Sequence, residues 1–445
     1  MIMISSKKRA ACRIAVTALC TLLACMAADA LDITLQVYRN ANNDDTIDKQ
    51  DIEYVKAIID GSKEKTKLAD ANYDGTIDEK DKTQIELIIE GKETSLIFID
   101  LFGDNVTIKK PIERVASLGF MGPQLLRLIG AEDKLLPIVG GSKEQYPVFW
   151  GDISSYHSVG ASPPDVDYEY ILSLSPDVVQ TNLEMLNYIS DSGKAQKKEF
   201  EKYLPGIPLI HLNAREPSYI SQSILIFGYI FDKEEQARKF ASWHDETLNK
   251  IKKVADQIPE VDKPTVLFQT HGAGYGFAAG GSRYGEAVRL AGGRNLLDDI
   301  ASSNSSNYGQ TRIEVDPEWV MSNNPQFIVS NYLDSNCTAG FETSNVSGAK
   351  KTIDAILNTN ELANVDAIKN GNVYYIDNFL VGGGGLNLIG AAFLGKLWHP
   401  GEYKDIDPMG ILQEYMEFYD SDFDVNSQGV FIYPSLFKNE GHYWR

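Results

Sequence analysis

The chain has 445 residues, of which 43% are hydrophobic and 23% are charged, and its formal net charge is −20 at pH 7. This length provides for two or three domains with sizeable cores. The acidic balance argues against nucleic acid and against an anionic membrane surface as binding partners.

Residues 1–30 are typical of a secretory signal. A basic stretch at residues 7–9 precedes an uncharged apolar stretch at residues 14–27, which is short for a membrane span. Two cleavage sites are possible. Residues 28–30 form a small-x-small peptidase site, and residues 22–25 resemble a lipobox that would leave Cys25 as a lipidated N-terminus. Both predict an exported, extracytoplasmic protein, at the cell surface or anchored to the membrane. Beyond this segment only Cys337 remains, so no intramolecular disulfide is expected.

Two acidic loops, residues 40–51 and 70–81, are the most specific feature of the chain. Each places oxygen-bearing side chains at positions 1, 3, 5, 9 and 12 and a threonine carbonyl at position 7, the pattern by which a twelve-residue loop wraps calcium. The expected ligands are Asn40, Asn42, Asp44, Thr46, Asp48 and Asp51 in the first loop and Asp70, Asn72, Asp74, Thr76, Asp78 and Asp81 in the second. Gly75 stands where the second loop must turn at positive φ, and Asp45 takes that place in the first. The sequence therefore predicts two calcium sites.

Each loop runs into a short amphipathic segment that ends at a glycine, Gly61 or Gly91. The loops end in aspartate and not in the glutamate of an EF-hand. This combination resembles the dockerin module, a duplicated calcium-loop-plus-helix unit that plugs into cohesin domains. The resemblance implies a small all-α, EF-hand-like module over residues 31–92 with a cohesin-like partner, and its folding should depend on calcium. A calcium-stabilised spacer without a protein partner is the alternative.

Beyond Gly91, short apolar runs alternate with helical stretches, which is typical of α/β architecture with parallel sheets. Strands are predicted at residues 114–119, 135–141, 176–181, 207–213, 264–271, 325–331 and 372–377, and helices at residues 123–131 and 168–175. Midway, residues 232–257 predict one uninterrupted helix with Asp232 as its N-cap. Such a helix spans roughly 39 Å at 1.5 Å per residue, which is enough to join two lobes.

The order of these segments resembles the solute-binding proteins of ABC importers for iron complexes, haem and cobalamin. The resemblance covers about residues 100–420 and rests on the ordered set RVASLGFMGPQLLRLIGAEDKLLPIVG, VGASPPDVDYEYILSLSPDVVQT, AGGRNLLDD, EVDPEWVMSNNPQFIVSNY and AIKNGNVYYID. It implies an α/β fold of two parallel-sheet lobes joined by one long helix, with the small calcium-loop module in front. The implied boundaries are 96–231 for the N-lobe, 232–257 for the helix and 260–445 for the C-lobe. An ABC permease and its ATPase are the implied partners.

In this family the ligand lies between the lobes, at the carboxyl ends of the strands. The matching loops of this chain are rich in tyrosine and tryptophan, whose flat rings suit a siderophore-bound iron, a haem or a corrinoid. The expected ligand-binding residues are Met121, Tyr146, Trp150, Tyr156, His271, Tyr275, Arg283, Tyr284, Tyr308, Arg312, Asn331 and Tyr332. His271 could bind the metal or a chelate oxygen, whereas Arg283 and Arg312 could pair with anionic groups.

Two glutamates carry a separate expectation. In the family, one acidic residue on the outer face of each lobe docks onto arginines of the permease, and the matching residues here are Glu169 and Glu318. The catalytic patterns HExxH, GxSxG and CxxC do not occur, so no enzymatic activity is predicted. The leading hypothesis is an exported protein that captures a metal complex and delivers it to an ABC importer. The alternative is a cell-surface adhesion or scaffold component that acts through the dockerin-like module.

Overall fold

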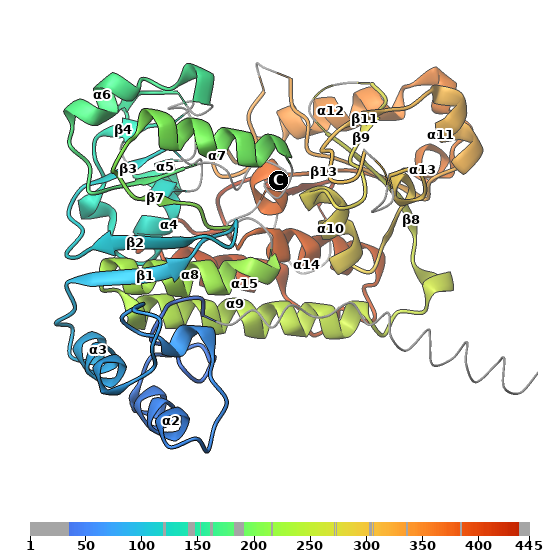
Figure 1. Ribbon diagram of the computed structural model, residues 1–445. Helices are drawn as coiled ribbons and strands as arrows, with labels where there is room; N and C mark the ends of the chain where they lie inside the picture. The colour runs from blue at the N-terminus through green and yellow to red at the C-terminus, as the bar shows by residue number, and fades with distance from the viewer. Residues whose placement is uncertain are drawn as a thin grey trace, which may run out of the picture.

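The computed structural model describes residues 35–435 apart from gaps at residues 119–121, 141–146, 152, 161–162, 182–190, 215–216, 271, 273, 302–304, 306, 335–336 and 383–384. The signal predicted at residues 1–30 and three predicted ligand-binding residues, Met121, Tyr146 and His271, lie outside the described residues. Two lobes stand side by side above a layer of helices, and a small helical module lies below one of them (Figure 1). None of the helices in the described ranges has the length and apolar character that crossing a membrane requires.

The N-terminal module consists of one unit that occurs twice. Helices α2 (Lys49–Ile59) and α3 (Glu79–Ile89) each have 11 residues, follow directly on the two acidic loops and pack against one another. Each begins with the same reciprocal capping box, in which an aspartate at the N-cap and a second aspartate three residues later bond to each other's backbone amides. A short 3-10 helix, η1 (Lys67–Ala69), lies between the two units.

A β-hairpin that the sequence analysis does not predict follows the module. Its strands are β1 (Ser95–Ile99) and β2 (Asn105–Lys109), which pair antiparallel. Strand β1 also pairs with the start of the module, because Val37 forms an antiparallel bridge with Phe98. Apolar side chains of α2, α3 and the hairpin are buried in the same hydrophobic cluster as side chains of the N-lobe. The module is therefore packed against the body and draws part of its core from it.

The N-lobe is built on a parallel sheet of three strands in the order β3-β6-β7. Its strands are β3 (Val115–Ser117), β6 (Val178–Gln180) and β7 (Leu209–Ile210), with a further parallel pair, β4 (Ile138–Val139) and β5 (His157–Ser158). Its helices are α4 (Gly122–Leu128), α5 (Pro147–Trp150), α6 (Tyr168–Ser173) and α7 (Asp191–Tyr203), with η2 (Glu132–Lys134) and η3 (Pro163–Asp165). Strands β3, β4, β6 and β7 form within predicted runs of buried apolar residues, whereas β5 has exposed side chains and is not predicted.

A helical hairpin crosses from the N-lobe to the C-lobe. Helix α8 (Pro217–Phe231) packs along α9 (Glu234–Ala255), which runs unbroken beneath both lobes (Figure 1). The predicted N-cap is wrong: Lys233 precedes α9 without a side-chain cap. Asp232 instead adopts a positive φ of 58° at the end of α8, where its carboxylate pairs with Lys110. Helix α9 is thus two residues shorter at each end than the predicted span of residues 232–257.

The C-lobe has a mixed sheet of seven strands in which the three central strands are parallel. Those are β8 (Thr265–Gln269), β12 (Phe327–Ser330) and β13 (Val373–Ile376), with the short strand β10 (Arg294–Asn295) parallel to β8. The other strands run antiparallel and are β9 (Gly276–Phe277), β11 (Ile313–Glu314) and β14 (Ile432–Tyr433). The expectation of a purely parallel sheet thus holds for the centre of this lobe and fails at its edges.

Helices cover the C-lobe sheet and close the molecule from below. They are α10 (Arg283–Leu290), α11 (Pro317–Asn323), α12 (Ser347–Leu357), α13 (Asp366–Lys369), α14 (Asn387–Trp398) and α15 (Pro408–Glu417), with η5 (Glu260–Asp262), η6 (Leu296–Asp299), η7 (Asn360–Leu362) and η8 (Asn378–Val381). Helix α15 returns to the N-lobe, where the hydroxyl of Tyr415 accepts a buried hydrogen bond from Gln124 Nε2 at 2.7 Å. The two lobes therefore share one hydrophobic core along their lower edge.

Candidate functional site

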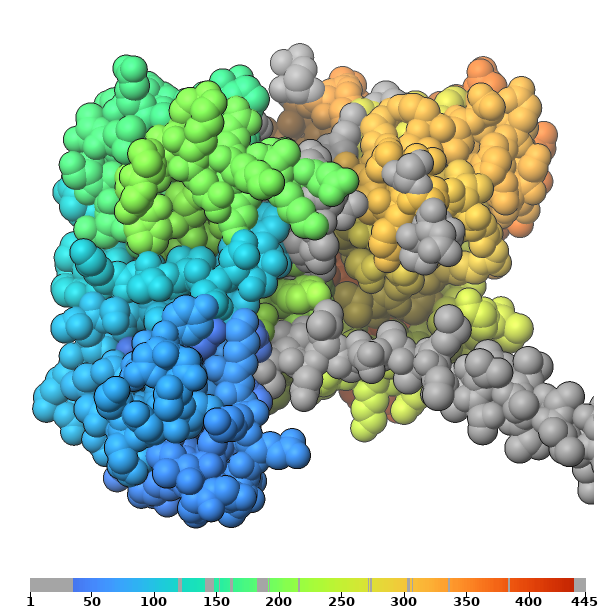
Figure 2. Space-filling model, viewed as in Figure 1, coloured from blue at the N-terminus to red at the C-terminus, as the bar shows by residue number. Residues whose placement is uncertain are grey.

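The carboxyl ends of the strands of both lobes meet at the junction between the lobes. Phe379 lies three residues beyond the end of β13, and its ring contacts that of Phe149, on the N-lobe helix that follows the loop after β4. Between the two lobes the surface is hollowed (Figure 2). Binding sites of α/β proteins form at such strand ends, so this hollow is the candidate cleft.

Two predicted residues and one unpredicted residue form a hydrogen-bonded network on the C-lobe side of the cleft. Asn378, the first residue of η8, accepts hydrogen bonds from Tyr284 Oη at 2.9 Å and from Asn331 Nδ2 at 2.8 Å. The three residues come from η8, from the first turn of α10 and from the residue after β12. Asn378 is not among the expected ligand-binding residues, although it is the first residue of 378–385, a loop that the family resemblance places at the cleft.

A buried aspartate holds Asn378 in place. Asp377 N-caps η8 by accepting a hydrogen bond from the amide of Phe379 at 3.0 Å, and it also accepts one from Tyr375 Oη. Complete burial raises the pKa of Asp377 to about 7, because desolvation penalises the charged carboxylate. The backbone at Gly340 approaches this carboxylate so closely that a Cβ there would overlap it. Asp377 therefore fixes the backbone that carries the network.

Arg283 adds a positive charge to the network. Its guanidinium stacks over the ring of Tyr284, 4.5 Å from the ring centroid, and Nη2 donates to Tyr284 Oη at 2.7 Å. Within the described residues no carboxylate pairs with Arg283, and its buried Nε has no hydrogen-bond partner. A half-buried guanidinium without a counter-charge is expensive in a protein with so many carboxylates, so the site is suited to an anionic group from outside the chain.

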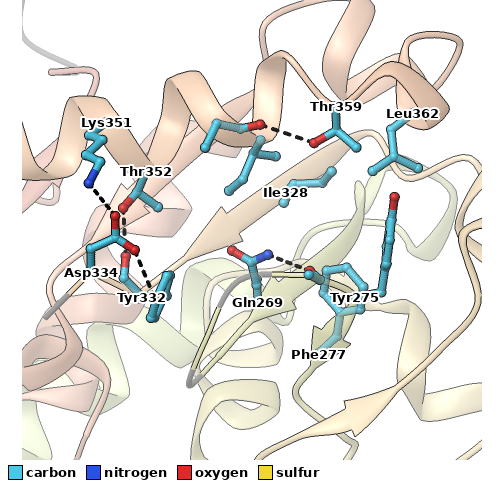
Figure 3. Close-up of a pocket in the computed structure, with 13 residues that line it drawn as sticks. Gln269, Tyr275, Phe277, Ile328, Tyr332, Asp334, Lys351, Thr352, Thr359 and Leu362 are labelled. Carbon is cyan, nitrogen blue, oxygen red and sulfur yellow. Dashed lines mark hydrogen bonds and ion pairs between the residues drawn. The ribbon is translucent and has the colours of Figure 1, made fainter.

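The C-lobe also holds a cavity of about 240 Å³ (Figure 3). It lies between the central strands and α12, and its walls include Phe277, Ile328 and Leu362. The predicted residues Tyr275 and Tyr332 also line it. Its apolar walls belong to a different hydrophobic cluster from the one that contains Tyr284, so the cavity and the network share no lining residue.

Charged side chains stand at one end of this cavity. The carboxylate of Asp334 accepts a hydrogen bond from Tyr332 Oη at 2.9 Å and pairs with Lys351 on α12 (Figure 3). The bond from Lys351 holds the pKa of Asp334 below its usual range, and the bond to Asp334 raises the pKa of Tyr332. The phenol is therefore protonated at neutral pH and acts as a donor.

The structure places four other predicted ligand-binding residues away from the network. Trp150 is almost fully buried in the core beneath the cleft, and Tyr156 is half-buried against the same core. Tyr308 is exposed and packs over Gly281, where a Cβ would overlap its ring. Arg312 pairs with Glu314 and donates to the backbone carbonyl of Thr270.

The N-lobe side contains a buried histidine to which the sequence analysis assigned no role. His211 directly follows strand β7, is 2% exposed, and shares a hydrogen bond of 2.6 Å between Nδ1 and Thr181 Oγ1. Desolvation, with a smaller contribution from Lys197, lowers the pKa of His211 to about 3. His211 is therefore neutral at physiological pH, and Nε2 has no hydrogen-bond partner in the described part of the chain.

The two glutamates that the sequence analysis singled out occupy equivalent places. Glu169 is the second residue of α6, Glu318 is the second residue of α11, and both side chains are exposed. Helices α6 and α11 lie at the outer corners of the two lobes, on the side of the molecule away from α9 (Figure 1).

The two acidic loops share their second halves and differ in their first halves. Position 4 has a positive φ in both, 59° at Asn43 and 58° at Tyr73. In the second loop Asp70 accepts hydrogen bonds from the amides at positions 5 and 6, whereas in the first loop Asn40 donates to the carbonyl of Asp44. Asn40 Oδ1 is buried and has no hydrogen-bond partner in the described part of the chain, and Asp45 does not adopt the positive φ of Gly75.

The side-chain oxygens of both loops are of the type that a hard divalent cation prefers, but the described residues contain no group of three or more His, Cys, Asp or Glu side chains arranged to hold a metal ion. The side chains are carboxylates and amides, and the buried, unpaired Asn40 Oδ1 at position 1 of the first loop is an oxygen that a bound cation would satisfy. The first loop also contacts the N-lobe, because the amide of Ile47 donates to Tyr229 Oη of α8 at 2.8 Å in a buried hydrogen bond. The cohesin-like partner that the dockerin resemblance implies stays a prediction.

Comparison with known proteins gives a family for the body of the chain. A family model described as periplasmic binding protein matches residues 124–379, which is more than half of the chain. Among curated proteins, the petrobactin-binding protein YclQ of Bacillus subtilis (strain 168) is 24% identical over 298 residues, or 66% of this chain and 84% of that protein.

Solved structures show the same fold. The TroA-like periplasmic binding protein FepB from Veillonella parvula matches with a TM-score of 0.60 and 19% identity over 76% of this chain and 98% of that one. A periplasmic solute binding protein from Veillonella parvula DSM 2008 matches with a TM-score of 0.58 and 20% identity over 75% of this chain and 97% of that one.

Proposed function

Because the chain belongs to the periplasmic binding protein family, we propose that it is the extracytoplasmic substrate-binding protein of an ABC importer. The ligand that we propose is a metal chelate, namely a ferric siderophore, a haem or a corrinoid, bound in the cleft between the lobes. The relative that is named for binding petrobactin supports a siderophore among these three. Export, and retention at the cell surface or on the membrane, belong to the same proposal.

The observation that carries this proposal is the guanidinium of Arg283, which pairs with no carboxylate among the described residues. It is fixed by stacking on Tyr284, whose hydroxyl is itself held by Asn378. An anionic chelate would supply the missing counter-charge, and the planar guanidinium suits two neighbouring oxygens of such a ligand.

Binding in this cleft should involve little closure of the lobes. Helix α9 runs unbroken beneath both lobes, and the core shared by α4, α5, η8 and α15 ties them together. A hinge would have to break that packing, because close-packed cores deform little. Delivery would then follow docking of the loaded protein on the permease through Glu169 and Glu318, without a large domain movement.

Calcium is proposed as a structural ion of the N-terminal module, with one ion in each acidic loop. The repeated ligand pattern and the unpaired Asn40 Oδ1 support this assignment. When bound, the ion would draw the carboxylate and amide oxygens of a loop together, and so stabilise the helix that follows.

Titration of the purified chain with four probes tests the proposed ligand class. The probes are a ferric tricatecholate, a ferric trihydroxamate, haemin and cyanocobalamin, each followed by calorimetry and by intrinsic tryptophan fluorescence. We expect one class to bind with a Kd in the micromolar range or below, and to displace no protein-bound calcium. Absence of heat and of spectral change with all four probes would refute a metal-chelate ligand.

A further inference from the structure

The two lobes repeat a short segment that continues beyond the glutamates. Helices α6 and α11 each lead into the central parallel strand of a lobe, β6 or β12. Each ends at a residue with positive φ, 49° at Ser175 and 42° at Asn324, and a buried proline follows in both. The α6 and α11 segments can therefore be aligned residue by residue from their local geometry alone.

The next residues extend the alignment. The side chain of Asp177 accepts a hydrogen bond from the amide of Arg114, just before β3. The side chain of Gln326 accepts one from the amide of Thr265, at the start of β8. Both bonds are 2.9 Å long and tie the segment to the neighbouring parallel strand.

This alignment pairs two exposed apolar side chains. Leu172 is equivalent to Met321, and the two are 41% and 40% exposed. They follow the fully buried Ile171 and Val320, so both helices turn one apolar residue into the lobe and the next one outward. Each lies three residues after its glutamate, which puts it on the same helix face as Glu169 or Glu318.

The neighbouring carboxylates are free to accept a cation. In the part of the chain that the structure describes, neither Glu169 nor Glu318 forms an ion pair. An ion pair at an open surface changes a binding constant by less than about fivefold, since water and salt screen it. An apolar contact next to the ion pair excludes water and so strengthens the attraction between the two charges. The central residues of protein interfaces act in this way.

We infer that Leu172 and Met321 are contact residues of the permease-docking surface, one beside each glutamate. The partner must present a basic side chain next to an apolar recess at two separate places. A permease built from two like halves presents each of its surface features twice. Charge complementarity and the repetition of the same pair on both lobes select this partner. The inference rests on the proposed function, because it names the complementary surface of the importer.

Polar substitution of both residues tests the inference. The variants are Leu172→Asn, Met321→Asn and the double variant, and the measured quantity is the affinity for the permease–ATPase complex of the same organism in lipid nanodiscs. We expect each single change to weaken docking about tenfold and the double change about 100-fold, since the two sites are far apart. Leu172→Met and Met321→Leu conserve volume and should retain docking within about twofold.

A matched control separates docking from general effects of surface polarity. Ile59→Asn removes a side chain with a similar exposure, 43%, on the N-terminal module, and should leave docking unchanged. All variants should bind the chelate identified for the wild-type chain with unaltered affinity, because neither residue belongs to the cleft. Docking of the double variant within about twofold of wild type would overturn the inference alone. Failure of the chelate-loaded wild-type chain to dock would overturn it together with the proposed delivery.

Discussion

The ring of Phe149, on α5 of the N-lobe, stacks on the ring of Phe379, on η8 of the C-lobe, with centroids 4.6 Å apart and 15° between their planes. Phe149 also meets the ring of Tyr415 on α15, edge to face at 6.0 Å. One N-lobe side chain thus contacts two C-lobe elements at the base of the cleft. The lobes are joined by packed aromatic rings as well as by α9, and this contact sets the cleft floor.

Replacement of Phe149 should weaken the whole molecule rather than one lobe. Phe149→Ala removes a fully buried ring, and we expect it to lower the free energy of unfolding by about 3–5 kcal/mol. Phe149→Leu retains most of the apolar volume and should cost less than about 1.5 kcal/mol. Urea denaturation followed by circular dichroism measures both values. A loss below about 1 kcal/mol for the alanine variant would contradict a shared interlobe core.

Arg283 should contribute strongly to ligand affinity. Arg283→Ala removes the unpaired guanidinium, and we expect about 30-fold weaker binding of the chelate identified by titration, or about 2 kcal/mol. Arg283→Lys keeps the charge but loses the planar guanidinium, so the affinity of this variant should lie between those of Arg283→Ala and wild type. Arg294→Ala is the control, because Arg294 is exposed and already pairs with Asp299. Equal affinities of Arg283→Ala and wild type would remove the main support for an anionic ligand.

Calcium should stabilise the entire chain. The module shares a core with the N-lobe, and Ile47 is hydrogen-bonded to Tyr229. We therefore expect calcium to raise the thermal midpoint of the whole chain and not of the module alone. Calcium at about 100 times its Kd should add roughly 2.7 kcal/mol per site to the free energy of unfolding. Differential scanning calorimetry in calcium and in EGTA measures the effect.

Loop variants assign the calcium effect. Asp70→Ala should reduce the stoichiometry from two ions to one in calorimetric titration, and Asp60→Ala, an exposed change outside both loops, should leave it at two. A thermal midpoint that is the same in calcium and EGTA would contradict calcium binding by either loop.

His211 should make the protein sensitive to acid. Its folded pKa of about 3 lies below its ordinary value of 6.5, so the unfolded chain binds the proton more readily between these limits. The contribution of His211 to the free energy of unfolding is fully present above pH 6.5. It decreases as the pH falls toward 3, by at most about 1.4 kcal/mol for each pH unit. The charges that act on it are Lys197, which lowers the pKa, and Asp104, which raises it.

Urea unfolding between pH 4 and pH 7 measures this dependence. We expect His211→Gln to have a flatter profile than wild type, because glutamine takes up no proton. His157→Gln serves as the control for replacing a histidine at an exposed position. Parallel profiles of wild type and His211→Gln would show that His211 is not the group responsible.

Much of the body could be predicted because its elements carry local signals. The central strands β6, β8, β12 and β13 coincide with predicted apolar runs, since each is buried on both faces and composed largely of Val, Ile, Phe and Tyr. The hairpin of β1 and β2 was missed. Its strands do carry a local signal, because the four consecutive residues 96–99 are apolar and Gly103 stands in the turn before β2.

The candidate site was predictable only in part. Arg283, Tyr284 and Asn331 were expected on the cleft, and the structure joins the last two through Asn378, an amide that no motif distinguishes. Arg312 was expected to bind anions by the same reasoning as Arg283. Its guanidinium instead pairs with Glu314 and covers Gly276, contacts that depend on the pairing of β9 with β11.

The sequence by itself determined the central strands, the long helix α9, the two acidic loops and the order of the two halves, because these depend on neighbours within one turn or one strand. Only the tertiary structure decided that Arg283 has no carboxylate partner among the described residues, which aromatic rings are buried between the lobes, and that Leu172 and Met321 are exposed. Those properties depend on contacts between residues that are hundreds of positions apart. Burial and ion pairing are set by what lies across the interface, and a local pattern contains no record of it.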